Sequence, residues 1–502
     1  MADELNHECG VAALCALDHG RERNVAAMMP GMLLDLQARG QLAAGFSTYD
    51  RDRPRIIETY KGVGTVGEVF RTSHAAKHAA LMNRYKGSMA IGHTRYATTG
   101  GDDVSYAQPF ERIHGQKWKW FSFAFNGTLS NYSELRETLI REHDYHFLLD
   151  TDTEIIMYAL AHQLRGEVQP QHGLMMNALS KQFDGSYSLA YMDAAGQLLV
   201  ARDPLGLRPM SWAEEDGILG AASESMALQN AGFKKIQSLE PGQMLLVQDG
   251  KYRLERFADA QALARCFFEW VYFSNVGSEI DGAGVYQSRA AAGRKLAEIE
   301  DQHIDERCVV VPVPDTAKAA ADAFAHRLGL PSVEGIVRNR YLGRSFIQPS
   351  YLRTTTAGRK YSTIPALLRD RRVFLIEDSL VRATTLRVLA KQLKAVGCAA
   401  EVHVRVACPP IVSPCFYGID MASKEELFAA RYAGGGKPSD LQEMSAELGV
   451  DSLRYLPATE LGSVIGVPQT SLCLGCVSGR YPTPAGNRLV QLGVAPCEGF
   501  DR

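Results

Sequence analysis

The sequence predicts two domains of different class, a strand-rich α+β domain followed by an α/β domain with a mostly parallel sheet. The chain has 502 residues, and a single hydrophobic core rarely grows past about 250–300 residues. The first half contains short apolar runs broken by glycine and turn residues. The second half alternates Ala-rich helical patterns with short β-branched runs, which is typical of strand–helix crossover units.

In the first half, strands are predicted from four stretches: ECGVAALCAL, GSMAIGHTRYATTG, WFSFAFNGTLSN and GSYSLAYMDAAGQLLVARD. Helical spacing of apolar residues predicts helices over roughly 24–38 and 153–164. The stretch LEPGQMLLVQDGKYRLERF carries PG and DG turn signals between strand-like runs. We interpret it as a hairpin that closes the first domain, and we place the domain boundary just after it, near Asp259.

In the second half, helical patterns such as AAAGRKLAEIE and DTAKAAADAFAHRLG alternate with the strand-like runs CVVVPVP, RRVFLIED and AEVHVRVA. Strands that alternate with helices in this way pair in parallel. The tail after roughly Arg488 carries little signal.

Composition excludes several function classes. The chain is 46% apolar and 22% charged, with a net charge of −3 and no long basic run, which argues against a dedicated nucleic-acid surface. No apolar run of about 18 residues predicts a membrane span. The leader MADELNHE is acidic and lacks the apolar core of a signal peptide. We therefore expect a cytoplasmic protein whose ten cysteines are reduced, metal-bound or catalytic.

Cys9 opens the first apolar run, directly behind this polar leader. One interpretation is a small buried hydrophobe at the start of a strand, since free cysteine is among the most buried residue types. The other is that residues 1–8 are removed and Cys9 becomes an N-terminal nucleophile. Its freed α-amine, with an unperturbed pKa of about 7.7–8.0, would then act as the base for the adjacent thiol.

The stretch RRVFLIEDSLVRATTLRVLAKQLKAVG is the most informative one. A buried strand over 373–376 is followed by Glu377 and Asp378 at its carboxyl end, where ligands bind in open α/β sheets. A short loop follows, and Thr384 begins an amphipathic helix whose N-terminal amides can hold a phosphate. The acids suit a sugar diol or a hydrated magnesium ion. The alternative is an ordinary helix N-terminus with an acidic pair and threonine caps.

This stretch resembles the ribose-phosphate motif of type I phosphoribosyltransferases, in which the acids contact the ribose of phosphoribosyl pyrophosphate (PRPP). Residues 338–350, 408–420 and 473–483 are similar to segments of one family in that class, the glutamine PRPP amidotransferases, which begin purine biosynthesis. The resemblance covers about Cys9 to Thr483. It implies an αββα sandwich of the Ntn-hydrolase type, followed by a type I phosphoribosyltransferase domain.

For the second domain, the resemblance implies a set of PRPP-binding residues: Glu377, Asp378, Ser379, Arg382, Thr384, Thr385, Arg340 and Tyr341. The last two belong to NRYLGR, which matches a loop that closes over PRPP in the family. Mg²⁺ is implied at Thr316, Glu377 and Asp378. Without the family, Thr316 would be a helix cap and NRYLGR a solvated basic loop.

For the first domain, the family pattern implies a propeptide that ends before Cys9, and the stretch HECG fits it. The Asn126 side chain and the Gly127 N–H are implied to stabilise the oxyanion. Arg95 is implied to bind the carboxylate of glutamine and Asp152 its ammonium. Without the family these would be a hairpin turn, a surface charge and a helix cap. The chain keeps the family order of Cys, Arg, Asn-Gly and Asp.

Some family members hold a structural [4Fe–4S] cluster, which needs four thiolates. The positions that match this subgroup are Cys266, Cys415, Cys473 and Cys476. Only the last two form a C-x-x-C, which by itself could be a redox pair or part of a zinc site. We expect a cluster here. Five other cysteines match nothing and are interpreted as packing residues: Cys15, Cys308, Cys398, Cys408 and Cys497.

Four features depart from the family pattern. Glu377 stands where a second Asp is usual, and Ala383 stands where Gly is usual. ARGQ, which begins at Ala38, replaces HRGQ. Asn275 and Val276 replace Arg-Pro after YFS. Glycine permits backbone angles and close approach that alanine adopts with difficulty, so Ala383 bears directly on the geometry of the phosphate loop and on PRPP affinity.

The sequence therefore predicts an amidotransferase that makes 5-phosphoribosylamine from glutamine and PRPP. Its predicted parts are a propeptide (1–8), a glutaminase domain (9–258), a phosphoribosyltransferase domain (259–485) and a tail (486–502). We expect a homodimer or homotetramer, purine nucleotides as inhibitors, and neither a nucleic-acid nor a membrane partner. Two alternatives remain open: an amidotransferase for another phosphoribosyl acceptor, and a PRPP- or nucleotide-sensing protein without turnover, which Ala383 favours.

Overall fold

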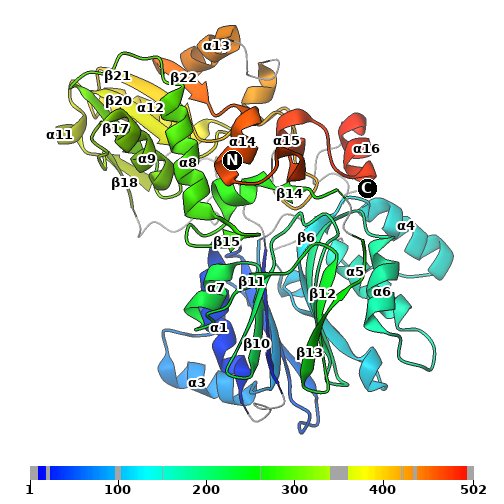
Figure 1. The fold of residues 1–502 in the computed structure, drawn as a ribbon. Coiled ribbons are helices and arrows are strands. Elements are labelled where there is room, and N and C mark those ends of the chain that lie inside the picture. Colours follow the sequence, from blue (N-terminus) through cyan, green and yellow to red (C-terminus); the bar gives the residue numbers. More distant parts are fainter. Residues whose placement is uncertain are drawn as a thin grey trace.

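The computed structural model describes residues 9–17, 23–96, 103–149, 151–259, 262–339, 360–419, 421, 423–432 and 438–493. A two-sheet sandwich forms the lower half of the molecule and a smaller α/β unit lies above it (Figure 1). The fold class predicted from the sequence is confirmed, because the first half is antiparallel and the second half contains a parallel sheet.

The first sheet of the sandwich has seven antiparallel strands, with β1 at its centre. Their spatial order is β11 (Gln237–Ser238), β9 (Ser211–Glu215), β10 (Ile218–Ala222), β1 (Gly10–Ala16), β4 (Met89–Arg95), β2 (Ala43–Tyr49) and β3 (Ile57–Val63). The second sheet has six, in the order β13 (Lys251–Arg256), β12 (Gln243–Gln248), β8 (Leu198–Arg202), β7 (Gly185–Asp193), β6 (Phe121–Leu129) and β5 (Phe110–Arg112).

Alternate residues of one strand serve two separate cores. On β1, Val11 and Ala13 face the second sheet and pack into the core between the sheets, whereas Ala12 and Leu14 pack under helices. The helices on that outer face are α1 (Met29–Asp35), α2 (Val66–Val69), α3 (Ala75–Arg84) and α7 (Ser225–Asn230). The second sheet is covered by α4 (Tyr132–His143), α5 (Asp152–Gln163) and α6 (His172–Ser180). The result is the αββα arrangement expected.

The predicted helix over 24–38 forms in three pieces. A 3₁₀ turn (Val25–Met28) precedes α1, and a second 3₁₀ turn (Leu36–Ala38) follows it. Pro30 lies in the first turn of α1, where its missing N–H and fixed φ suit a helix start but not a helix interior. The predicted closing hairpin is β12–β13, which turns at Asp249 and Gly250.

The upper unit contains a parallel sheet in the order β17 (Cys308–Pro312), β20 (Arg372–Glu377), β21 (Glu401–Val406) and β22 (Ser452–Tyr455). Its helices are α8 (Val285–Glu298), α9 (Lys318–Leu328), α11 (Pro365–Leu368), α12 (Thr384–Ala395), α13 (Pro438–Leu448) and α14 (Leu461–Ile465). Short strand pairs are β14 (Arg265–Cys266) with β23 (Leu472–Cys473), β15 (Glu279–Ile280) with β16 (Ala283–Gly284), and β18 (Ile336–Arg338) with β19 (Tyr361–Thr363).

The end of the described chain returns to the sandwich. Helices α15 (Gly475–Ser478) and α16 (Pro484–Leu492) follow β23, and α16 lies beside α4 (Figure 1). Arg488 pairs with Glu134 of α4 at 2.7 Å, and the Ala485 N–H donates to Asp184. Across the described residues, no helix combines the length and apolarity that a membrane crossing requires.

Candidate functional site

Cys9 lies immediately before β1, at the end of the sandwich that faces the upper unit. Its side chain is half-buried, and its Sγ lies 3.9 Å from the carbonyl oxygen of Tyr96. A Cβ on Gly10 would come within 2.7 Å of the Thr94 hydroxyl and 2.9 Å of Leu36. The residue after Cys9 must therefore be glycine for β1 to reach its place in the sheet.

Asn126 comes from the other sheet, and Ser223 joins it to the Cys9 strand. The Ser223 hydroxyl accepts a hydrogen bond from the Val11 N–H at 3.0 Å and one from the Asn126 side-chain amide at 3.5 Å. Both Ser223 and Asn126 are fully buried. Gly127 follows with φ +147°, a backbone angle that glycine adopts readily. The sequence analysis missed Ser223, because the surrounding ASESM carries no recognisable motif.

Arg95 and Asp152 both lie near this point. Arg95 ends β4, is 6% exposed, and its guanidinium lies 5.4 Å from the ring centre of Tyr106. Asp152 begins α5 and accepts a hydrogen bond from the Leu129 N–H of β6 at 3.3 Å. Burial raises the pKa of the Asp152 carboxyl to about 7, although hydrogen bonds from neighbouring amides oppose the shift. The structure thus brings the four predicted glutaminase elements to one end of the sandwich.

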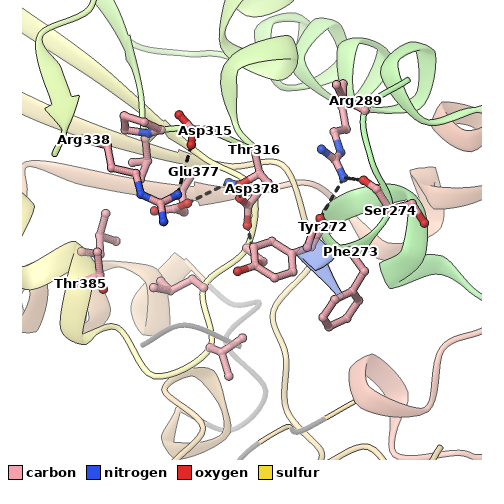
Figure 2. Close-up of a pocket in the computed structure, with 18 of the residues that line it drawn as sticks. Tyr272, Phe273, Ser274, Arg289, Asp315, Thr316, Arg338, Glu377, Asp378 and Thr385 are labelled. Carbon is pink, nitrogen blue, oxygen red and sulfur yellow. Dashed lines mark hydrogen bonds and ion pairs between the residues drawn. The ribbon is translucent and has the colours of Figure 1, made fainter. Parts of the chain in front are cut away.

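A pocket of about 310 Å³ opens at the carboxyl end of β20. Of the predicted residues, Glu377, Asp378, Ser379, Thr385 and Thr316 line it. Figure 2 shows the two acids between Arg338 on one side and Arg289 on the other. This is the position that the strand–loop–helix pattern predicts for a ligand.

Asp378 is held in place by hydrogen bonds from two hydroxyl groups. The Ser379 hydroxyl donates to its Oδ1 at 2.7 Å, and the Thr316 hydroxyl donates to its Oδ2. Burial raises the pKa of this carboxyl, while the two hydroxyl donors and the nearby Arg289 charge oppose the rise. The pocket therefore presents an oriented, oxygen-rich edge that suits a hard cation or sugar hydroxyls.

Arg289 lies on the opposite side of the pocket and was not predicted from the sequence. Its guanidinium donates to the carbonyl oxygen of Trp270 at 2.9 Å. It also donates to those of Tyr272 and Ser274 at 2.9 and 2.8 Å (Figure 2). The residue is 5% exposed and lies on α8. The Ala-rich pattern of that helix indicates only packing, so a buried arginine within it gave no functional signal.

Residues 382–384 of the phosphate loop differ in their relation to the pocket. The Arg382 guanidinium pairs with Glu426 at 3.2 Å, and neither Arg382 nor Thr384 is among the residues that line the pocket. Ala383 adopts φ +67° and is fully buried at the start of α12. Ala383 therefore adopts a left-handed backbone angle, which glycine adopts more readily than alanine. Arg340 and Tyr341 lie outside the described residues.

The four predicted cluster cysteines come from three segments of the upper unit. Cys266 and Cys473 are neighbours across β14 and β23. Burial, together with the nearby Cys415, Cys266 and Cys473, raises the pKa of the Cys476 thiol. Burial raises the pKa of the Cys473 thiol to about 12, and the Cys415 thiol adds to the rise. Within the described part of the chain, no group of three or more His, Cys, Asp or Glu side chains is placed to hold a metal ion.

A buried ionic network connects the sandwich with the pocket wall. Arg39 is fully buried and donates to Glu224 at 2.6 Å and to Glu269 and Ser274 at 2.5 and 3.0 Å. Glu224 also accepts from the Asn275 N–H at 2.7 Å. The sequence analysis gave no role to Arg39 or to the two glutamates, whose pairing depends on contacts between distant segments.

The same segment of the sandwich touches both sites. Ala38 lines the pocket that contains Asp378. Two residues on, a Cβ on Gly40 would lie 2.5 Å from the backbone of Arg95. The fold and the two sites together define a glutamine amidotransferase joined to a phosphoribosyltransferase.

Comparison with known proteins gives the family. A model described as a glutamine amidotransferase domain matches residues 79–258. The amidophosphoribosyltransferase of Methanothermobacter thermautotrophicus is 36% identical over 96% of both chains, and that of Bacillus subtilis is 34% identical over 95% of both. A solved structure of glutamine PRPP amidotransferase from B. subtilis, complexed with ADP and GMP, superposes with a TM-score of 0.81 at 32% identity. It covers 95% of this chain and 98% of that one.

The chain belongs to the amidophosphoribosyltransferase family. The resemblance identified from the sequence is therefore confirmed.

Proposed function

We propose that this chain hydrolyses glutamine at Cys9 and passes the ammonia to PRPP, giving 5-phosphoribosylamine, glutamate and pyrophosphate. One observation carries the proposal: the segment Ala38–Gly40 lines the pocket of Asp378 at one end and packs against Arg95 at the other. One three-residue segment of the sandwich therefore borders both sites, which supports direct transfer of ammonia between them.

In the first half-reaction, the α-amine of Cys9 accepts the thiol proton once residues 1–8 are removed. The thiolate attacks the side-chain amide carbon of glutamine, and the Asn126 amide and the Gly127 N–H stabilise the negative oxygen. The C–N bond breaks, the amine returns the proton to the leaving ammonia, and water hydrolyses the thioester to glutamate. Arg95 and Asp152 bind the carboxylate and ammonium of glutamine.

In the second half-reaction, ammonia attacks C1 of PRPP, the bond to the pyrophosphate oxygen breaks, and the nitrogen loses a proton. Glu377 and Asp378 orient the ribose, while Ser379 and Thr385 contribute hydroxyl donors toward the phosphate. The protein thus acts mainly by positioning. We assign Arg382, Thr384, Arg340 and Tyr341 to the same substrate on the family resemblance.

Mg²⁺ fits the oxygen donors of Thr316, Glu377 and Asp378, because this ion prefers one or two carboxylates together with substrate oxygens. When bound, it neutralises the charge of the leaving pyrophosphate.

A [4Fe–4S] cluster fits the donor set of Cys266, Cys415, Cys473 and Cys476. The raised thiol pKa values reflect burial and mutual repulsion, both of which a cationic iron centre would offset. These residues would supply the four thiolates that such a cluster requires. Its role is structural: it would hold three segments of the upper unit together.

We place the domain limits at 9–258 and 259–485, with a propeptide before them and a tail over 486–502. Helix α16 extends from the second domain into this tail and packs on the sandwich. Purine nucleotides are the inhibitors we expect, and a homo-oligomer is the expected assembly.

The test is a single-tube assay of anaerobically purified protein, in which glutamate and pyrophosphate are followed with and without PRPP and Mg²⁺. Equimolar release that requires PRPP is the expected result. Glutamate release without any pyrophosphate would overturn the proposed acceptor. Calorimetric binding of PRPP with neither product formed would instead favour the sensing alternative.

A further inference from the structure

The second domain contacts the sandwich next to the proposed oxyanion site. The segment Phe416–Gly418, which follows Cys415, lies against the end of β6. The Ser130 hydroxyl donates to the carbonyl oxygen of Phe416 at 2.9 Å. A Cβ on Gly418 would lie 3.0 Å from the Thr128 hydroxyl and 3.2 Å from the carbonyl carbon of Gly127. The backbones of two glycines from different domains thus lie so close that there is little room for a side chain on Gly418.

A buried hydrogen-bond relay joins the same two segments. The Thr128 N–H donates to the Ser186 hydroxyl at 3.1 Å, and that hydroxyl donates to the carbonyl oxygen of Tyr417 at 2.7 Å. The Arg208 guanidinium donates to the same carbonyl oxygen. Ser186 and Arg208 are fully buried. One carbonyl of the second domain therefore accepts two buried donors from the first.

Both glycines are needed for this contact. Gly127 has φ +147°, and a Cβ there would lie 2.0 Å from the carbonyl oxygen of Ser186. Gly418 has φ +95°. The Gly127 backbone is enclosed by β7 and by the Phe416–Gly418 turn, so a small displacement of that turn would move it.

We infer that the Phe416–Gly418 turn of the second domain is a positioning element of the glutaminase, with Gly418 as its key residue. The turn fixes the Gly127–Thr128 backbone at the point where an oxyanion forms. The inference rests on the proposed oxyanion role of Gly127. It goes beyond that role, because it makes glutamine cleavage depend on a segment of the phosphoribosyltransferase domain.

The experiment compares wild type with Gly418→Ala and the matched control Gly466→Ala. Gly466 also has a left-handed φ, of +87°, but a Cβ there meets nothing within 4 Å. Both changes therefore carry a similar backbone strain, and only the first touches the turn. We expect Gly418→Ala to lower kcat for glutamine hydrolysis by about 10- to 100-fold, since removing one oxyanion donor costs about 10²- to 10³-fold and a displaced donor costs part of that. The control should stay within about twofold of wild type.

Two further readouts separate positioning from general damage. Ammonia-dependent synthesis should be unchanged in Gly418→Ala, and so should KM for glutamine. Alkylation of Cys9 by 6-diazo-5-oxo-L-norleucine should keep its wild-type rate, because displacement at its methylene carbon places no full negative charge on the carbonyl oxygen. Loss of alkylation together with kcat would overturn the inference, because it would indicate a collapsed site.

A second variant covers the case in which Gly418→Ala does not fold. Ser186→Ala removes the relay without adding an atom and should lower kcat about two- to tenfold, the usual range for one hydrogen bond. A wild-type kcat in either variant would overturn the inference alone. Wild-type protein that hydrolyses no glutamine would overturn the proposed function as well.

Discussion

The glutamine end and the phosphoribosyl end of this molecule are built differently. At the glutamine end, Asn126 lies within β6 of one sheet and Arg95 ends β4 of the other, and the buried Ser223 joins Asn126 to β1. At the phosphoribosyl end, Glu377, Asp378 and their neighbours lie at the carboxyl end of β20 and in the loop after it, around an open pocket. Strand positions are fixed by the packing of both sheets, whereas loop positions are fixed mainly by local contacts.

This difference matches where the chain departs from its family. The departures identified in the sequence (Ala38, Asn275, Val276, Glu377 and Ala383) all line the phosphoribosyl pocket. The predicted nucleophile, oxyanion groups and glutamine clamp keep the family residues. The departures identified in the sequence thus lie together at the phosphoribosyl end, and the predictions below test the two ends separately.

The largest expected effect comes from removing the nucleophile. Cys9→Ala, produced without residues 1–8, should lower glutamine-dependent synthesis by at least about 10³-fold, because no other group can form the thioester. Ammonia-dependent synthesis should stay within about twofold of wild type. Pyrophosphate release with each nitrogen source measures both. Equal loss of the two activities would show that the ends are not separable.

At the other end, Asp378→Asn should lower ammonia-dependent synthesis by about 100-fold. The amide cannot accept from both the Thr316 and Ser379 hydroxyls as the carboxylate does, and it binds a hard cation weakly. Some glutamine hydrolysis should persist, because the change leaves the groups at the glutamine end in place. A variant that makes product at the wild-type rate would rule out the assigned role of this carboxylate.

An effect of intermediate size is expected in the pH dependence of glutamine binding. The pKa of Asp152 is raised to about 7 by burial, and the ammonium of glutamine needs the ionised carboxylate. Binding should therefore be constant above about pH 8 and weaken about tenfold for each unit below pH 7. Calorimetry on Cys9→Ala avoids turnover. Asp152→Asn should bind weakly and without this slope, and a slope that survives in this control would exclude Asp152 as its source.

The smallest effect is expected at Ala383. Its left-handed backbone costs a residue with a Cβ about 1–2 kcal/mol. Ala383→Gly relieves this strain but loses a buried methyl and adds chain entropy, together of similar size. The thermal midpoint should therefore change by less than about 4 °C, and KM for PRPP by less than about threefold. A gain of tenfold in PRPP affinity would show instead that alanine distorts the loop.

Much of this molecule could be predicted from the sequence. Helix α5, the closing hairpin β12–β13 and strand β20 followed by α12 lie where the patterns indicated. The pocket residues Glu377, Asp378 and Thr385 were predicted because they are consecutive or nearly so. Functional residues that lie in one local segment form a recognisable motif, since the backbone geometry of a strand–loop–helix unit repeats among proteins.

Residues that act through long-range contacts could not be predicted. Ser223 is 212 positions from Val11 in the chain, and Arg39 is 230 from Glu269. Arg289 resembled an ordinary helical residue, and Gly418 resembled an ordinary turn glycine. No local pattern marks such residues, because their partners are set by how the two domains pack.

The sequence by itself determined the two fold classes and the family, and it predicted the reactive groups, because periodicity and motifs express local backbone preferences and local chemistry. Only the tertiary structure decided which groups support them. It placed a hydroxyl between the Val11 N–H and the Asn126 amide, gave Ala383 a left-handed angle, and set a turn of the second domain against Gly127. These are consequences of close packing between distant segments, where the free energy depends on shape and burial that no single stretch of sequence contains.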